Sequence, residues 1–210
     1  MEGVKIMFFD VGDTLVCEDD AMQMRFAAQA ATDEAKALGI TAKMMYDDVV
    51  QAAKNFQPLY RTMLKKYGFT ESVPYTGEYE RLHDGAVELL EAMSKKYELG
   101  IIANQGDGLA ERLKNWGVDK YFKVVVSSWD YQIMKPDVRL FEAALAKSGY
   151  SAAQAAMIGD RLDNDVFPAK KLGMKTVWIR QGFGGMQTPP SAEYEPDETI
   201  DSLAELYNIF

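Results

Sequence analysis

The chain has 210 residues, 48% of them hydrophobic and 26% charged, a mixture typical of a globular protein rather than a disordered or fibrous one. Its 23 Lys and Arg residues against 32 Asp and Glu residues give a formal net charge of −9. Affinity for nucleic acid and for anionic membranes depends on basic side chains, so we expect neither kind of partner.

The chain contains one cysteine, Cys17, and one histidine, His83, which excludes a disulfide framework, a cysteine-based zinc site and multi-histidine metal sites. The first residues lack the order of a signal peptide, and the apolar runs are far shorter than the roughly 20 residues that span a bilayer. We therefore expect a cytoplasmic protein. Any catalysis would depend on carboxylates, lysine, hydroxyl groups or a metal ion.

Five short apolar runs each end at a polar or glycine-containing turn. Their continuous β-branched and aromatic residues are typical of strands buried on both faces. Helical patterns separate the runs from the second onward, which predicts right-handed crossovers and an α/β fold with a doubly wound parallel sheet. The predicted strands are residues 4–9, 99–103, 123–127, 155–159 and 175–179.

One connection is too long for a crossover, because the next β–α pattern after the first strand does not begin until about Asp84. The intervening residues predict helices over 21–38, 43–56 and 58–67, placed over the site as a lid would be. Toward the C-terminus, residues 182–196 predict a surface loop and residues 201–206 a short final helix.

Polar residues follow the predicted strands, at the edge where doubly wound sheets hold their sites. Carboxylates at two neighbouring strand ends, beside one lysine and no histidine, favour a hard cation such as Mg²⁺. Mg²⁺ in turn recruits phosphate, and Asp can act as a covalent nucleophile in phosphoryl transfer. Arg161 and Asp163 are expected on a solvated loop. The candidate site residues are Asp10, Gly12, Asp13, Asn104, Gln105, Lys135, Asp160 and Asp165.

Three motifs occur in a specific order: Asp-x-x-x-Thr-Leu from Asp10, Lys135-Pro136 before a helix, and Gly-Asp-x-x-x-x-Asp from Gly159. With the helical insertion after the first motif, the chain resembles the haloacid dehalogenase superfamily of hydrolases over essentially its whole length. The resemblance implies a Rossmann-like core, residues 1–16 and 83–210, with a small helical cap domain, residues 17–82. Most members are Mg²⁺-dependent phosphatases.

The resemblance also implies roles for the motif residues. Asp10 would attack the substrate phosphorus and form an aspartyl-phosphate. Asp160, an Asp10 oxygen and the backbone carbonyl of Gly12 would bind Mg²⁺, and Asp165 would complete that site directly or through water. Lys135 would neutralise Asp10 and the phosphoryl oxygens. Asn104, with N–H groups near it such as those at Gln105, would hold the phosphate.

Two positions depart from the pattern that the family's phosphatases share. Gly12 stands where they place a second Asp that protonates the leaving oxygen, and Ala103 stands where Ser or Thr usually bonds the phosphoryl group. General acid–base catalysis contributes about 10²–10⁴-fold, so its loss would leave a slow or restricted enzyme. Asp13, or a cap carboxylate such as Asp19 or Asp20, is an alternative proton donor; Asp13 is equally a turn residue that bonds local backbone.

The sequence therefore predicts a Mg²⁺-dependent phosphatase of a small phosphorylated metabolite. The first alternative is a catalytically weak metal-binding protein with a sensor or partner role. A dehalogenase or phosphonate-cleaving enzyme is a second alternative. Dehalogenation needs no metal, so the retained Asp160 and Asp165 argue against it. The oligomeric state and the substrate are left open. Candidate substrate contacts in the cap are Arg25, Tyr46, Tyr60 and Arg61.

Overall fold

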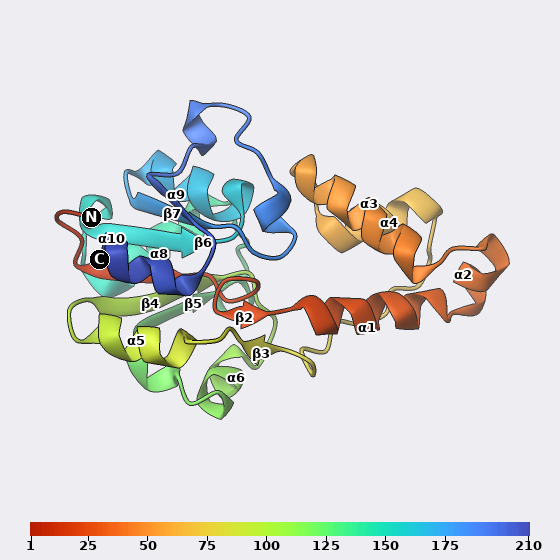
Figure 1. Ribbon diagram of the computed structural model, residues 1–210, viewed down its shortest axis with the longest axis horizontal. Coiled ribbons are helices and arrows are strands. Elements are labelled where there is room, and N and C mark those ends of the chain that lie inside the picture. Colours follow the sequence, from red (N-terminus) through yellow and green to blue (C-terminus); the bar gives the residue numbers. More distant parts are fainter.

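A six-stranded parallel sheet forms the centre of the protein in a computed structural model that describes all 210 residues (Figure 1). Strand β1 lies in the interior of the sheet, with β4 on one side and β6 on the other. The order of the strands reverses at β1, since β4 and β5 continue the sheet on one side and β6, β7 and β8 continue it on the other. This reversal point is where doubly wound sheets place their sites. In spatial order the strands are β5 (Phe122–Ser127), β4 (Glu98–Ala103), β1 (Ile6–Phe9), β6 (Ala155–Gly159), β7 (Lys175–Ile179) and β8 (Glu198–Ile200).

All five predicted strands are present, and the α/β fold class is confirmed. The sixth strand, β8, was not predicted. It has only three residues, and of these only Ile200 is buried, so it lacks the apolar run that marks the other strands. The carboxyl ends of β1 and β6 still meet at the centre of the sheet as the pattern requires.

Helices cover both faces of the sheet, and β1 shows how its residues divide between them (Figure 1). Met7 and Phe9 pack with helices α5, α6 and α10, whereas Ile6 and Phe8 pack with α8 and α9. Side chains alternate between the two faces of a strand, so each face has its own core. The helices are α5 (Ala86–Ser94), α6 (Leu109–Asn115), α7 (Ser128–Tyr131), α8 (Val138–Ser148), α9 (Phe167–Leu172) and α10 (Leu206–Ile209).

Four further helices lie beside the sheet, at the opposite end of the molecule from the two termini (Figure 1). They have a separate core in which Phe26, Met45, Val49 and Met63 are fully buried. The helix predicted over 21–38 is two helices, because Thr32 interrupts it and its side chain accepts the Ala35 N–H at 3.2 Å as an N-cap. The four are α1 (Asp19–Ala30), α2 (Asp33–Leu38), α3 (Ala42–Lys54) and α4 (Leu59–Tyr67).

The chain enters and leaves this helical segment at one place. Strand β2 (Val16–Cys17) precedes α1, strand β3 (Arg81–Leu82) follows α4, and the two strands pair antiparallel. We call this pair the β2–β3 junction. The division into a core of 1–16 with 83–210 and a cap of 17–82, whose boundaries fall at this junction, stays a prediction.

The segment after β7 is not simply a surface loop, as the sequence predicted. Phe183 is buried among the aromatic residues of the helical segment, with its ring centroid 5.5 Å from that of Tyr46. Gln187 is also buried, and its Nε2 donates to the Ala53 carbonyl of α3 at 3.2 Å. The two side chains connect the sheet to the helices. None of the helices is long and apolar enough to cross a membrane.

Candidate active site

Two carboxylates follow the neighbouring strands β1 and β6. The Asp10 N–H donates to the Ile158 carbonyl at 2.9 Å, which extends the parallel ladder by one residue and fixes the start of the turn. Beyond it, the Val11 carbonyl accepts N–H groups from Leu15 at 3.0 Å and Val16 at 2.9 Å, so the chain turns back at once. Asp160, directly after β6, is buried at this edge.

Asp165 reaches the same place from the π-helical turn Leu162–Val166. Its side chain is fully buried, and its Oδ2 accepts the Arg161 N–H at 2.9 Å. A β-carbon on residue 159 would overlap the Asp165 carboxyl group, so only glycine leaves room for it. One carboxylate oxygen from each of Asp10, Asp160 and Asp165 lies within 4.8 Å of the other two.

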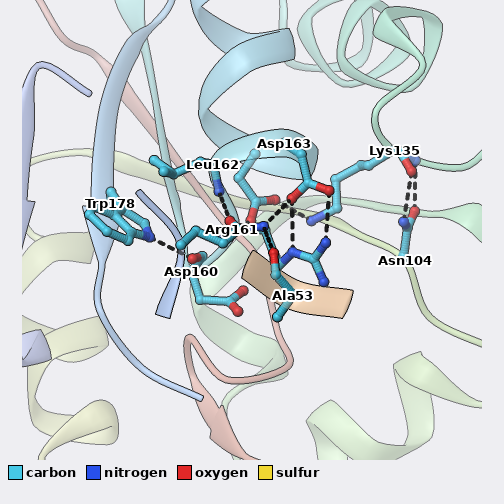
Figure 2. Close-up of polar contacts among 10 residues, drawn as sticks. Ala53, Asn104, Lys135, Asp160, Arg161, Leu162, Asp163 and Trp178 are labelled. Atoms are coloured by element: carbon cyan, nitrogen blue, oxygen red, sulfur yellow. Dashed lines mark hydrogen bonds and ion pairs between the residues drawn. The ribbon is translucent and has the colours of Figure 1, made fainter. Parts of the chain in front are cut away.

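Lys135 provides the positive charge among these three acids. Its buried Nζ lies 2.8 Å from Asp10 Oδ1 and 2.5 Å from Asp165 Oδ1. Although burial lowers the pKa of Lys135, the two carboxylates raise it above its ordinary value, so the side chain is a cation. The Asn104 amide fixes the Lys135 backbone, with its Nδ2 donating to the carbonyl at 3.0 Å and its Oδ1 accepting the N–H at 2.7 Å (Figure 2).

One ammonium group does not balance three carboxylates. Burial, followed by repulsion from Asp165 and Asp10, raises the pKa of Asp160 well above its ordinary value. Burial likewise raises the pKa of Asp165 to about 6, even though Lys135 opposes the shift. A cluster of crowded carboxylate oxygens with excess negative charge fits a hard divalent cation.

A cavity of about 220 Å³ lies against this cluster. Six of the eight predicted site residues line it, whereas Lys135 and Asp165 do not, although Lys135 pairs with both Asp10 and Asp165. The six are Asp10, Gly12, Asp13, Asn104, Gln105 and Asp160. Of helices α1 to α4, only α4 contributes, through Leu59 at its start. The Gln105 side-chain oxygen accepts from Arg112, which orients the amide in the wall.

Arg161 and Asp163 do not lie on a solvated face, contrary to the prediction. Their side chains are 11% and 16% exposed, and the Arg161 guanidinium donates to both Asp163 oxygens, at 2.8 and 2.7 Å (Figure 2). Asp163 also accepts from Gln187 Nε2 at 2.9 Å, and Arg161 lines the cavity. The structure thereby adds a cationic group to the site that strand-end reasoning missed.

Asp13 is committed to the backbone around it. Its Oδ1 accepts the Glu18 N–H at 3.2 Å, and its carboxyl group lies so close to Gly182 that a β-carbon there would overlap it. Burial raises the pKa of Asp13 to about 6. Its role as an acid–base residue stays a prediction.

Glu18 is the site carboxylate that the sequence did not reveal. It follows β2 directly and lines the cavity beside Gly12, whereas Asp19 and Asp20 are exposed and Asp20 pairs with Arg81 at 2.8 Å. Burial, then the charges of Asp13 and Glu80, raise the pKa of Glu18 to about 8. The only signal in the sequence is its place at the start of the helical insertion.

The four cap residues suggested as substrate contacts do not line this cavity. The Arg25 guanidinium lies 3.4 Å from the ring centroid of Tyr60, and its Nε donates to the Val73 carbonyl at 2.9 Å. Tyr46 packs against Phe183. Arg61 is exposed.

Relatives of the chain include several phosphatases. A glyceraldehyde 3-phosphate phosphatase from Methanocaldococcus jannaschii is 29% identical over 98% of this chain and 96% of its own length. A phosphoserine phosphatase from Thermus thermophilus is 33% identical over 57% of this chain and 47% of its own length.

Solved structures share the fold. A HAD phosphatase from Thermococcus onnurineus matches with a TM-score of 0.70 at 24% identity, covering 98% of this chain and 97% of its own. The HAD-hydrolase YfnB from Bacillus subtilis bound to magnesium matches with a TM-score of 0.69 at 23% identity, covering 99% of both chains. The haloacid dehalogenase-like hydrolase family model matches residues 8–179, from β1 through β7. The chain belongs to the haloacid dehalogenase-like hydrolase family.

Proposed function

We propose that the protein is a magnesium-dependent phosphatase that hydrolyses a small phosphorylated metabolite through a phosphoenzyme on Asp10. The observation that carries the proposal is the position of Asp10. Its carboxylate lines the cavity, is 13% exposed and is paired with buried Lys135 at 2.8 Å. A carboxylate that is held in a fixed orientation at the end of a strand is suited to attack phosphorus.

The surrounding residues would stabilise the charge that the reaction moves. Lys135 faces Asp10 and would offset negative charge on the attacking and phosphoryl oxygens. Arg161 lines the cavity and would offer a second cation to the phosphate. Asn104 would act mainly by holding Lys135 in place, since both polar atoms of its amide already bond that backbone.

The acidic cluster would hold the magnesium ion. Asp10, Asp160 and Asp165, with the backbone carbonyl of Gly12, are oxygen ligands of the kind that Mg²⁺ prefers. The ion would supply charge neutralisation to a bound phosphate that otherwise meets several carboxylates. The acidic net charge thus agrees with a phosphate substrate only when a cation is bound.

The names of the relatives and the size of the cavity both favour a small substrate. Several relatives similar to the whole chain are glyceraldehyde 3-phosphate phosphatases. The cavity of about 220 Å³ is smaller than the roughly 300–1,000 Å³ that drug-sized ligands occupy. The predicted cap, residues 17–82, would close over it through Leu59. A cytoplasmic location and the lack of affinity for nucleic acid belong to the same proposal.

A panel of phosphate esters tests this function. The panel contains 4-nitrophenyl phosphate, glyceraldehyde 3-phosphate and phosphoserine, each assayed for phosphate release with Mg²⁺ and with a chelator. We expect hydrolysis of at least one ester with Mg²⁺ and none with the chelator. A protein that binds Mg²⁺ but hydrolyses nothing would favour a sensor or partner role, as Gly12 and Ala103 suggest. Halide release from haloacids without metal would favour a dehalogenase.

A further inference from the structure

Phosphate ester hydrolysis leaves a negative oxygen on the departing alcohol, and the cavity should contain a group that protonates it. Cleavage of an alkyl ester gains about 10²–10⁴-fold from such a group. Lys135 is held between two carboxylates, and the Arg161 guanidinium does not release its proton. The donor must therefore be one of the carboxyl groups around the cavity.

Most of these carboxyl groups are already committed. Asp10 is the proposed nucleophile, and Asp160 and Asp165 belong to the acidic cluster. Asp13 also lines the cavity, but its Oδ1 accepts the Glu18 N–H and its carboxyl group packs against Gly182.

Two other acids near the start of α1 lie outside the cavity. Asp19 and Asp20 are exposed, and neither lines the cavity wall. Asp20 is also paired with Arg81 at 2.8 Å. Glu18 is the carboxyl group that remains.

Glu18 occupies the space that a side chain at position 12 would take. A β-carbon on Gly12 would overlap Glu18 Oε1 and would lie 2.8 Å from Glu18 Cδ and 3.3 Å from Oε2. Gly12 is two residues after Asp10, and all three residues line the same cavity. The missing side chain at Gly12 therefore leaves room for the Glu18 carboxyl group in the cavity that Asp10 also lines.

The β2–β3 junction and the turn after β1 hold Glu18 there. Its N–H donates to Asp13 Oδ1 at 3.2 Å, and its carbonyl accepts the Met22 N–H at 2.9 Å as the first bond of α1. Cys17, the preceding residue, pairs with Arg81 across the junction. The backbone of Glu18 is thus anchored on both sides while its carboxyl group faces the cavity.

We infer that Glu18 is the acid–base residue of the reaction, an inference that rests on the proposed phosphatase function. As an Asp10 oxygen bonds to phosphorus and the ester P–O bond breaks, the leaving oxygen takes the Glu18 proton and departs as an alcohol. The Glu18 carboxylate then takes a proton from water while the water oxygen attacks phosphorus. The Asp10–phosphorus bond breaks, and phosphate, the Asp10 carboxylate and protonated Glu18 result.

The substitution Glu18→Gln tests the role through the leaving group. The full-length variant and the wild type are compared on 4-nitrophenyl phosphate, whose phenolate leaves without a proton, and on glyceraldehyde 3-phosphate, whose alkoxide needs one. We expect the rate of phosphoenzyme formation to fall about 10²–10⁴-fold with the alkyl ester and about tenfold or less with the aryl ester. Asp13→Asn and Asp19→Asn should show no such selective loss.

A relocated carboxyl group gives a second test that does not depend on loss alone. Gly12→Asp by itself should reduce activity, because its side chain would collide with Glu18. The double variant Gly12→Asp with Glu18→Ala should be at least tenfold more active on the alkyl ester than Glu18→Ala alone. Melting curves of each variant verify that it is folded.

The outcomes separate the two proposals. A wild-type protein inactive on both esters would overturn the phosphatase function and the role of Glu18 together. An active wild type, with equal losses of phosphoenzyme formation from both esters in folded Glu18→Gln or a selective loss in Asp13→Asn instead, would overturn the role of Glu18 alone.

Discussion

The carboxyl ends of β1 and β6 and the β2–β3 junction bring acidic side chains to the same cavity by different means. Asp10 and Asp160 follow strands that are fully buried and hydrogen-bonded on both sides. Glu18 follows a two-residue strand that pairs with one partner. The sheet edge is therefore a rigid frame for charge, whereas the junction holds its carboxyl group through a few local bonds.

The largest expected effect comes from the sheet edge. Asp10→Asn should lower kcat roughly 10⁴–10⁶-fold, the range seen when a covalent catalyst loses its nucleophile. The variant should also fail to form an acid-stable phosphoprotein with labelled substrate. Asp119→Asn, which changes an exposed aspartate, is the control and should keep wild-type activity. Activity of Asp10→Asn within tenfold of wild type would remove Asp10 from the mechanism.

Lys135→Met tests how much the stability of the sheet edge depends on the ammonium group that pairs with Asp10 and Asp165. Without Mg²⁺, we expect the free energy of unfolding to fall by about 3–5 kcal/mol, because buried Asp10 and Asp165 lose their partner. Urea denaturation followed by circular dichroism measures the change. The control, Lys123→Met, breaks an exposed pair with Glu98 and should cost about 1 kcal/mol or less. Equal losses in the two variants would contradict the comparison.

Magnesium should stabilise the sheet edge directly. At about 100 times its Kd, the ion should add about 2.7 kcal/mol and raise Tm by about 5–10 °C. Asp160→Asn should abolish most of that rise. It should not lower the stability of the metal-free protein, because it removes a buried carboxylate that Asp165 and Asp10 repel. Differential scanning calorimetry with Mg²⁺ and with chelator measures both effects; an unchanged magnesium shift in Asp160→Asn would remove this residue from the metal site.

Gln187→Leu probes the contact between the two regions and should have the smallest effect. Gln187 bonds the Leu162 N–H at 2.7 Å, the Ala53 carbonyl at 3.2 Å and Asp163 at 2.9 Å. Loss of these bonds leaves buried groups without partners and should cost about 1–3 kcal/mol in urea denaturation. Gln51→Leu, on the exposed face of α3, should stay within about 0.5 kcal/mol of wild type. No difference between the variants would show that the contact contributes nothing.

The sheet and its edge were predictable because they depend on local signals. Apolar runs mark the long strands, and parallel strands bring their carboxyl ends to one edge, so Asp10 and Asp160 could be placed together from sequence. Strand β8 could not be predicted, since its one buried residue, Ile200, makes no pattern. Its three residues are assigned by their pairing with β7 alone.

The rest of the site depends on contacts between distant residues. Glu18 faces the cavity because residues 16–17 pair with residues 81–82, and no spacing rule near Glu18 reports that pairing. Gln187 likewise reaches Ala53 across most of the chain, so its loop looked like solvent-exposed sequence. Prediction therefore succeeded where position follows from strand order and failed where it follows from loop packing.

The pairing of β2 with β3 has a consequence for how this protein can vary. Because Cys17 and Arg81 are paired, the residues between them form a loop that leaves the core and returns to it at one place. The entropy of closing such a loop grows only with the logarithm of its length, and doubling it costs about 0.6 kcal/mol. The four helices could therefore be exchanged for longer or shorter ones at little thermodynamic expense, provided that the replacement retains Glu18 at its entry and a partner for Gln187.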